Sequence, residues 1–301
     1  VIYISHRIQE VKRIADRVTI LRDGKVIQTS NAESLDINTI IKAMADREVE
    51  DRYPKLNVKT GPVVFSVKNV NFEGRIFDVS FDVKKGEIFG ITGLSGSGRR
   101  TLAKVLFGIE GPYTGMIEIY GRKLKTMTPK IAKKNGLCFV TGIGTGEGLI
   151  NNMNVSKNIT VTDLLRISRM GVIDGGKELR YARDYIKRLE IQTSEKEIVD
   201  NLSGGMQKKV IFAKWLFANA KILIIDEPTA GIDISSKVDI YNIINELVLS
   251  GSSVIMISSD FSEITGMCDR VAVMYNGRIQ KILQRDECTQ EKILYYASGG
   301  K

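Results

Sequence analysis

Three short apolar runs limit the fold of this chain more than any other feature of its sequence. Residues 87–92 lead into a glycine-rich turn and a helical pattern, and uninterrupted apolar runs follow at residues 221–225 and 254–257. Runs of this kind, in which polar residues do not alternate with apolar ones, are typical of strands that a parallel sheet buries on both faces. Because helical patterns separate these strands, the sequence predicts an α/β fold.

Two further regions add to this core. Residues 63–70 and 76–83 have the composition of strands, and residues 155–200 are rich in Leu, Ile, Arg and Lys at helical spacing. We therefore expect two strands before the first core strand, and an inserted helical subdomain in the middle of the chain.

The composition is that of an ordinary globular protein. Among 301 residues, 44 Lys and Arg stand against 35 Asp and Glu, a net charge of +9, and 43% are hydrophobic. These values exclude a disordered acidic chain and a collagen-like chain. The three cysteines are far apart and odd in number, which indicates a reducing compartment, and the single histidine excludes a multi-histidine metal site. No apolar run approaches the roughly 20 residues of a spanning helix, so we expect a soluble, cytoplasmic-type protein.

An internal repeat indicates two related domains. Residues 1–27 align without gaps on residues 254–280, an offset of 253. Because residues 1–5 have the pattern of a buried strand with no initiator Met, we expect a fragment of a longer polypeptide. The predicted division is a remnant of a first domain at 1–45, a linker at 46–62 and a second domain at 63–301. Identical pairs in this register include Val1/Val254, Ser5/Ser258, Glu10/Glu263, Asp16/Asp269, Arg17/Arg270, Val18/Val271 and Gly24/Gly277.

A glycine-rich turn between a strand and a helix is the first candidate site. In this position the backbone N–H groups can surround a phosphate. The pattern G-x-x-x-x-G-K-[ST] is met only at its two glycines, because Arg99 replaces the lysine and Arg100 replaces the hydroxyl that binds Mg²⁺. A glycine turn without a ligand is the alternative. The candidate nucleotide-binding residues are Gly93, Leu94, Ser95, Gly96, Ser97, Gly98, Arg99, Arg100 and Thr101.

An acidic pair ends a predicted core strand. Asp226 and Glu227 follow the apolar run at 222–225. Phosphoryl transfer needs positioning and charge neutralisation more than covalent chemistry. The sequence therefore predicts that Asp226 holds hydrated Mg²⁺ and that Glu227 is the catalytic residue that polarises the attacking water.

A Ser-Gly-Gly turn opens a predicted helix whose buried face includes Val210 and Phe217. Ser203 is placed to cap this helix, and the two glycines allow a phosphate to approach its N-terminus. The motif consists of Leu202, Ser203, Gly204, Gly205, Met206 and Gln207.

Together, the three motifs resemble those of ABC transporter ATPases. The glycine-rich turn resembles the Walker A motif, the acidic pair the Walker B motif, and the Ser-Gly-Gly turn the signature motif. The resemblance covers essentially the whole chain. It implies a P-loop NTPase fold of the ABC ATPase type: a mainly parallel core sheet with an antiparallel β subdomain and a helical subdomain at about residues 150–205. It also implies ATP and Mg²⁺ as cofactors.

The resemblance also implies a partner domain, because in this family two ATPase domains face head to tail. Each ATP lies between the phosphate loop of one domain and the signature of the other. His6 falls at the position of the switch histidine, which reaches the γ-phosphate and acts in catalysis, and Ser259 takes this position in the second copy. Asp233 falls in the loop that crosses between the domains.

Several departures from the family pattern predict a degenerate second site. Gly142 stands where the family places Gln or Glu, Ser259 replaces the histidine and Arg100 replaces the Mg²⁺ hydroxyl. One preorganised contact of this kind can be worth about 10²–10³ in turnover. We expect this site to bind nucleotide without normal hydrolysis, and the fragment alone to be weak or inactive. The competent site would pair the absent first phosphate loop with the signature of this chain.

The resemblance is narrower to the ATP-binding proteins of bacterial monosaccharide importers of the ribose, galactose and xylose type. Their second phosphate loop carries an arginine, and their domain junction is similar to residues 46–54, with Asp46 in place of Gly. Lys208 departs from the second Gln of their signature, a conservative change in what we expect to be a solvated first turn.

The resemblance implies partners and a location. The chain would work with membrane permease subunits, indirectly with a periplasmic or extracellular sugar-binding protein, and with the other ATPase domain, on the inner face of the cell membrane. Phe72 is the candidate for adenine stacking, although it could equally be a core residue. The alternatives are an ABC ATPase that acts on ribosomes, a nucleotide-binding module without turnover, and an importer of nucleosides or autoinducer. No nucleic acid is expected, because the positive residues are spread along the chain.

Overall fold

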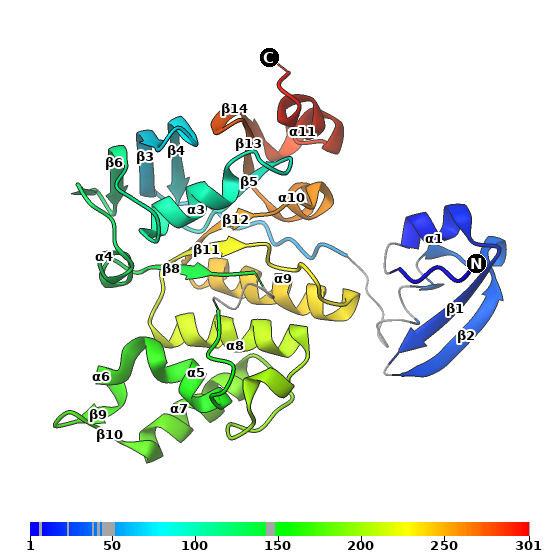
Figure 1. The fold of residues 1–301 in the computed structure, drawn as a ribbon, viewed down its shortest axis with the longest axis horizontal. Coiled ribbons are helices and arrows are strands. Elements are labelled where there is room, and N and C mark those ends of the chain that lie inside the picture. The colour runs from blue at the N-terminus through cyan, green and yellow to red at the C-terminus, as the bar shows by residue number, and fades with distance from the viewer. Residues whose placement is uncertain are drawn as a thin grey trace.

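The computed structural model describes residues 1–5, 8–22, 24–37, 39–40, 43, 52–142 and 148–300. Figure 1 shows a small unit formed by the N-terminal residues and a larger unit that begins at residue 52.

The larger unit is built on a mixed sheet with a parallel core. Within the described residues six strands form it, and the parallel pairs β13/β5, β5/β12, β12/β11 and β11/β8 make up its centre, while β14 is antiparallel to β13. The α/β prediction and the parallel core are confirmed. In sheet order the strands are β14 (Arg278–Gln284), β13 (Arg270–Tyr275), β5 (Ile88–Gly93), β12 (Ser253–Ile257), β11 (Ile222–Asp226) and β8 (Leu137–Val140).

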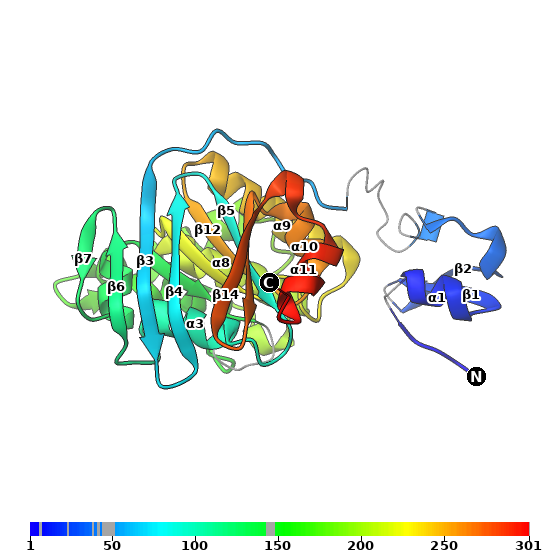
Figure 2. The same ribbon diagram turned by 90° about the horizontal axis from the view of Figure 1, so that it is seen from above.

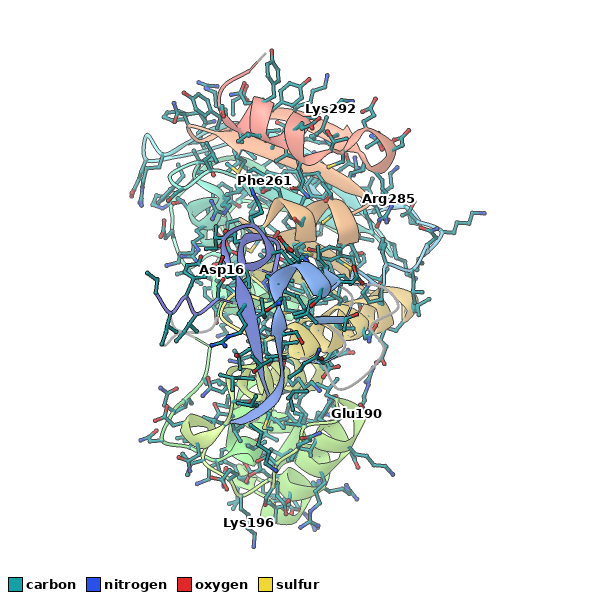
Figure 3. The ribbon with its side chains drawn as sticks, turned by 90° about the vertical axis from the view of Figure 1, so that its right-hand side faces the viewer. Asp16, Glu190, Lys196, Phe261, Arg285 and Lys292 are labelled. Atoms are coloured by element: carbon teal, nitrogen blue, oxygen red, sulfur yellow. The ribbon has the colours of Figure 1, made fainter. Side chains whose placement is uncertain are left out.

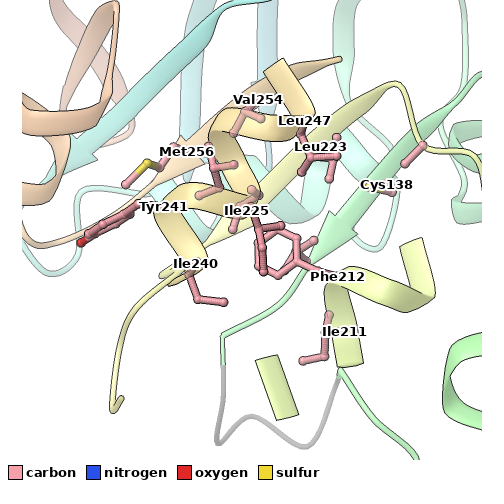
Figure 4. Close-up of a cluster of buried hydrophobic side chains, with 14 of the residues drawn as sticks. Cys138, Ile211, Phe212, Leu223, Ile225, Ile240, Tyr241, Leu247, Val254 and Met256 are labelled. Carbon is pink, nitrogen blue, oxygen red and sulfur yellow. The ribbon is translucent and has the colours of Figure 1, made fainter. Parts of the chain in front are cut away.

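The apolar runs are continuous because each strand packs against two different layers. Leu223 and Ile225 of β11 belong to one hydrophobic cluster, with residues of α8 and α9, while Ile222 and Ile224 belong to another, with residues of α3. Figure 4 shows the first cluster, in which Phe212 lies beside Ile225. The helices of this unit outside the helical subdomain are α3 (Arg99–Phe107), α4 (Pro129–Lys134), α8 (Gly204–Phe217), α9 (Ile234–Leu249), α10 (Phe261–Met267) and α11 (Gln290–Ala297), with the 3-10 turn η4 (Arg285–Glu287).

A second, antiparallel sheet lies over α3 (Figure 2). Its order is β4 (Ile76–Lys84), β3 (Val63–Phe72), β6 (Thr114–Ile119) and β7 (Arg122–Leu124). The two strands predicted at its start are β3 and β4, each slightly longer than expected. This sheet contributes a turn to the site described below.

The helical subdomain begins after β8 and ends before α8. It contains α5 (Val155–Thr160), η2 (Val161–Asp163), α6 (Leu164–Ile167), the short hairpin β9 (Ser168–Arg169) and β10 (Val172–Ile173), α7 (Gly175–Arg188) and η3 (Val199–Asn201). The prediction of an inserted helical region is confirmed.

The described part of the predicted linker packs on the larger unit. The Tyr53 and Tyr241 rings lie 5.6 Å apart, and the Leu56 N–H donates to Asn245 Oδ1 over 3.3 Å. The Lys55 ammonium lies 2.9 Å from Asp269 Oδ1, and its side chain is 2% exposed. Residues 53–56 are therefore held against α9 and the start of β13.

The N-terminal unit has the same elements as the end of the larger unit. Its helix α1 (Ile8–Ile14) and strands β1 (Arg17–Arg22) and β2 (Lys25–Asn31), followed by η1 (Ala32–Ser34), match α10, β13, β14 and η4 at the offset of 253. The hairpin irregularity recurs at the same place, between Ile20 and Leu21 in one copy and Val273 and Met274 in the other. Figure 3 faces this unit, which Asp16 marks between α1 and β1. The internal repeat is therefore present in the structure as well as in the sequence.

Among the described residues, no helix has both the length and the apolar character needed to cross a bilayer.

Candidate functional site

The phosphate-loop candidate connects β5 to α3, as the sequence predicts. Gly98 precedes α3 in the left-handed region, with φ at 95°, and no side chain caps the helix. The N–H groups of the first helical turn therefore remain available to an anion. Gly93 is required for a different reason, because a Cβ atom there would lie 2.4 Å from the Met274 backbone oxygen.

A cavity of about 490 Å³ opens beside this loop. Two hairpin turns complete it, one between β3 and β4 and one between β13 and β14. Gly277 ties them together, because its N–H donates to the Ser97 oxygen and its oxygen accepts from the Phe77 N–H, both over 2.9 Å. The cavity is lined by Gly74, Arg75, Phe77, Ser95, Gly96, Gly98, Arg99, Arg100, Thr101, Asn276 and Gly277.

Arg99 folds back over the loop. One of its terminal nitrogens, Nη1, donates to the backbone oxygens of Gly93 and Leu94, each over 3.0 Å. The other, Nη2, lies 3.1 Å from Glu227 Oε1. Arg99 therefore links the phosphate loop directly to the end of strand β11.

Glu227 is held on several sides. Its carboxylate accepts the Ser259 backbone N–H at 3.1 and 3.3 Å and the Ser259 hydroxyl at 3.1 Å, in addition to the Arg99 contact. Its backbone adopts φ of 47°, which is uncommon for a residue with a side chain. The predicted catalytic carboxylate is thus part of a fixed network, with Ser259 as its neighbour.

Asp226 ends β11 and lies beside the other arginine. Arg100 Nε is 3.4 Å from Asp226 Oδ2, and Asp226 Oδ1 is buried without a hydrogen-bond partner. Burial raises the pKa of Asp226 above its ordinary value, while the Arg100 charge opposes this effect and the Glu227 charge adds to it.

These residues do not fit the Mg²⁺ site expected from the family resemblance. Mg²⁺ prefers oxygen ligands, but Arg100 occupies the position of the expected hydroxyl and Gly142 that of the expected Gln or Glu. Among the described residues, no group of three or more His, Cys, Asp and Glu is placed to hold a metal ion. Asp226, the residue expected to hold Mg²⁺, has a guanidinium group against its carboxylate.

The signature turn has the predicted local structure. Ser203 caps α8, accepting the Met206 N–H over 3.4 Å, and Gln207 Nε2 donates to the oxygens of Val199 and Leu202. A Cβ atom at Gly205 would lie 2.4 Å from Ser236 Oγ. The cavity lining beside the phosphate loop includes none of the described signature residues.

Asp233 performs the matching role at the next helix. It caps α9, accepting the Ser236 N–H over 2.9 Å and its hydroxyl over 2.6 Å. The packing of Ser236 on Gly205 therefore connects the loop of Asp233 to the signature.

The expectation that Lys208 lies in a solvated turn is wrong. Lys208 is completely buried, and its ammonium group donates to the backbone oxygens of Thr141, over 2.7 Å, and Glu227, over 3.4 Å. Burial lowers the pKa of Lys208 from 10.5 to about 8, although the Asp226, Glu263 and Glu227 charges oppose the shift. Lys208, the fifth residue of α8, thus contacts the chain just after the carboxyl ends of β8 and β11, which the sequence motif did not indicate.

Phe72 is a core residue, so its proposed role in stacking on adenine is not supported by its position. It is 3% exposed, and the Arg75 guanidinium lies 4.8 Å above its ring. Phe77 lines the cavity in its place. Arg75 and Asn276 lie in hairpin turns and Phe77 lies at the start of β4, and they were missed because none of them belongs to a sequence motif.

Two predicted features fall wholly or partly outside the described residues. His6 is one, so its position as a switch histidine is not described. The other is the glycine-rich segment after β8, of which Gly142 and Gly148 are described and residues 143–147 are not.

Comparisons with known proteins agree with these motifs. The family model described as "ABC transporter" matches residues 76–230. The chain is 43% identical to a ribose import ATP-binding protein of Bacillus subtilis and 43% identical to a xylose import ATP-binding protein of Thermoanaerobacter pseudethanolicus. Each match includes 100% of this chain and 61% of the relative, so the chain spans about three fifths of these relatives.

Solved structures support the fold. A nucleotide-free ATP-binding cassette of an ABC transporter matches with a TM-score of 0.66 at 20% identity, covering 79% of this chain and 100% of that chain. An ATP-binding cassette in its ADP conformation matches with a TM-score of 0.65 at 22% identity, covering 79% and 95%. With the phosphate loop, the signature and the acidic strand end in their expected places, the chain belongs to the ABC transporter family of ATP-binding proteins.

Proposed function

We propose that this chain is part of an ATP-binding subunit that powers sugar import through a membrane permease, and that its own phosphate-loop site is degenerate. The relatives named for ribose and xylose import support the substrate class. The observation that carries the degenerate site is the contact between Arg99 and Glu227, with Ser259 on the same carboxylate. A carboxylate engaged in this way is not free to polarise water.

The signature motif of this chain would contact the nucleotide of a different site, formed with another ATPase domain. Ser203 and the following glycines lie outside the cavity beside the phosphate loop, as expected if they face the nucleotide of another domain. In the proposed composite site, the other domain supplies its phosphate loop and holds Mg²⁺. His6 would serve as the switch residue of that site, with Asp233 at the domain boundary.

The N-terminal unit supports the presence of the other ATPase domain, which would precede residues 63–301. Val1, Ile2 and Ile4 are more than 90% exposed, whereas the matching residues Val254, Ile255 and Ile257 are fully buried in the larger unit. The strand expected at residues 1–5 does not form in this structure, because no neighbouring strand is present among the described residues to pair with it. An apolar segment of this kind would be buried if it joined a sheet. Residues 1–45 would complete the first ATPase domain, and 63–301 would form the second.

The proposed location and partners follow from this role. The subunit would lie on the inner face of the membrane, bound to permease subunits and supplied indirectly by an extracytoplasmic sugar-binding protein. The 301-residue chain alone would bind ATP but hydrolyse it weakly, because it lacks the phosphate loop that its signature serves.

Two substitutions in the full tandem protein, assembled with its permease, test this assignment. Ser203→Arg places a cation in the competent site and is expected to lower sugar-stimulated ATP hydrolysis by about 10²-fold or more. Glu227→Gln is expected to change this rate by less than about twofold, because Glu227 lies in the degenerate site. Comparable losses from both substitutions would show that the two sites hydrolyse ATP equally and would overturn the proposal.

A further inference from the structure

Both carboxylates at the end of β11 are paired with arginines of the phosphate loop. Arg99 Nη2 lies 3.1 Å from Glu227 Oε1, and Arg100 Nε lies 3.4 Å from Asp226 Oδ2. Two guanidinium groups thus neutralise the charge of these carboxylates, a role that a divalent cation would otherwise have. A guanidinium beside Asp226 also repels a cation approaching the same carboxylate.

The lining of the cavity beside the phosphate loop is also positively charged. Among the described residues that line the cavity, the charged ones are Arg75, Arg99 and Arg100, and none is Asp or Glu. Arg75 is paired with Glu73 over 2.8 Å, so Arg99 and Arg100 carry the argument. Guanidinium groups bind phosphate oxygens with short, directional hydrogen bonds. The cavity therefore offers a polyphosphate both the backbone N–H groups of the loop and the positive charge that a metal ion normally brings.

Release of the two arginines toward a ligand affects the two carboxylates differently. If Arg99 moves away, Glu227 keeps the Ser259 N–H and hydroxyl as donors. The Arg100 side chain is 56% exposed, so its release from Asp226 requires little rearrangement. Asp226 then has no ion-pair contact with any described residue, and only the charge of the nearby buried Lys208 opposes its own. The network is thus arranged to exchange one anion for another.

We propose that this site binds a nucleoside triphosphate as the metal-free anion, with the guanidinium groups of Arg99 and Arg100 replacing the charge of Mg²⁺. The inference rests on the proposed binding of ATP to this chain, and it goes further by naming the ionic form that is bound. It gives a physical reason for binding without turnover, because the site would hold the phosphates without the metal ion.

Calorimetric titration of ATP into the 301-residue chain tests the inference, once with EDTA and once with excess MgCl₂ at equal ionic strength. The expected result is binding in EDTA that is at least about threefold tighter than binding in MgCl₂, because Mg²⁺ neutralises the charge that the arginines recognise. The double substitution Arg99→Lys/Arg100→Thr restores the residue pattern of a Mg²⁺-dependent phosphate loop. It is expected to reverse the preference to about tenfold in favour of MgCl₂.

The single substitution Arg100→Thr, at a largely exposed side chain, provides a second test and is expected to remove the preference for EDTA. Arg122→Thr, at an exposed position in β7, is the matched control and is expected to keep the wild-type preference. Tighter binding of the wild-type chain in MgCl₂ would overturn the metal-free inference and leave the proposed ATP binding intact. Absence of binding in both conditions would overturn both.

Discussion

The Lys208 ammonium group lies 2.7 Å from the backbone oxygen of Thr141, at the end of β8, and it also reaches the Glu227 backbone oxygen, after β11. A single buried cation thus joins the N-terminal part of the signature helix to two neighbouring strand ends. One of these strands leads into the segment after Thr141, and the other carries the acidic pair. Lys208 therefore holds the signature and the acidic strand end in a fixed relation.

Lys208 is expected to give stability a measurable pH dependence. The pKa of Lys208 is lowered to about 8, so between about pH 8 and 10.5 the unfolded chain binds a proton that the folded chain has released. Stability from this group therefore rises with pH across that window. Relative to Lys208→Gln, the wild-type chain should gain about 2 kcal/mol between pH 7 and pH 9.5.

Urea unfolding at the two pH values measures this difference. Lys221→Gln, at an exposed lysine, is the control and should show no such change. An equal wild-type-to-variant difference at both pH values would show that the folded chain does not depress the pKa of Lys208.

Lys55 is expected to anchor residues 53–56 to the domain. Its ammonium contacts both oxygens of Asp269, at 2.9 and 3.0 Å, and Asp269 also accepts the Ile88 N–H. Lys55→Met removes the buried cation and should lower the free energy of unfolding by about 2–3 kcal/mol, less than for a fully enclosed pair, because Asp269 keeps the Ile88 bond. Chemical denaturation measures the loss. Lys59→Met, at an exposed lysine, should change stability by less than about 0.5 kcal/mol.

Gly205 is expected to be intolerant of any side chain. A Cβ atom there would lie 2.4 Å from Ser236 Oγ and 2.8 Å from Ser236 Cβ, so Gly205→Ala must push α8 away from α9. The expected cost is about 1–3 kcal/mol of stability. Adding Ser236→Gly removes both clashing atoms and should recover part of this loss, which a double-mutant cycle measures. Strictly additive losses would argue against the contact.

Phe77 and Phe72 are expected to differ in their effect on nucleotide binding. Phe77 lines the cavity, whereas Phe72 is buried in the core. If the base stacks on Phe77, then Phe77→Leu should weaken ATP binding by about tenfold, a loss typical of base–aromatic stacking. Phe72→Leu should lower the melting temperature but leave the affinity nearly unchanged. Titration calorimetry and thermal unfolding separate the two effects, and the reverse pattern would favour Phe72 as the stacking residue.

Much of the fold was predictable because it depends on local patterns. The apolar runs at 221–225 and 254–257 predicted buried parallel strands, and both form the centre of the main sheet. The cap at Ser203 was predictable for the same reason, since it depends on residues within one helical turn. The turns that carry Arg75 and Asn276 were not, because nothing in their local sequence indicates a ligand site.

The sequence by itself determined the family and the order of the motifs, since a strand, a glycine turn and a helix are specified by neighbouring residues. Only the tertiary structure decided the environment of the charged side chains. Arg99 meets Glu227 across 128 positions, and Lys208 meets Thr141 across 67. Burial and pairing of a charge depend on what the folded chain brings from such distances, so a lysine expected in solvent became a buried cation and two loop arginines became partners of the acidic pair.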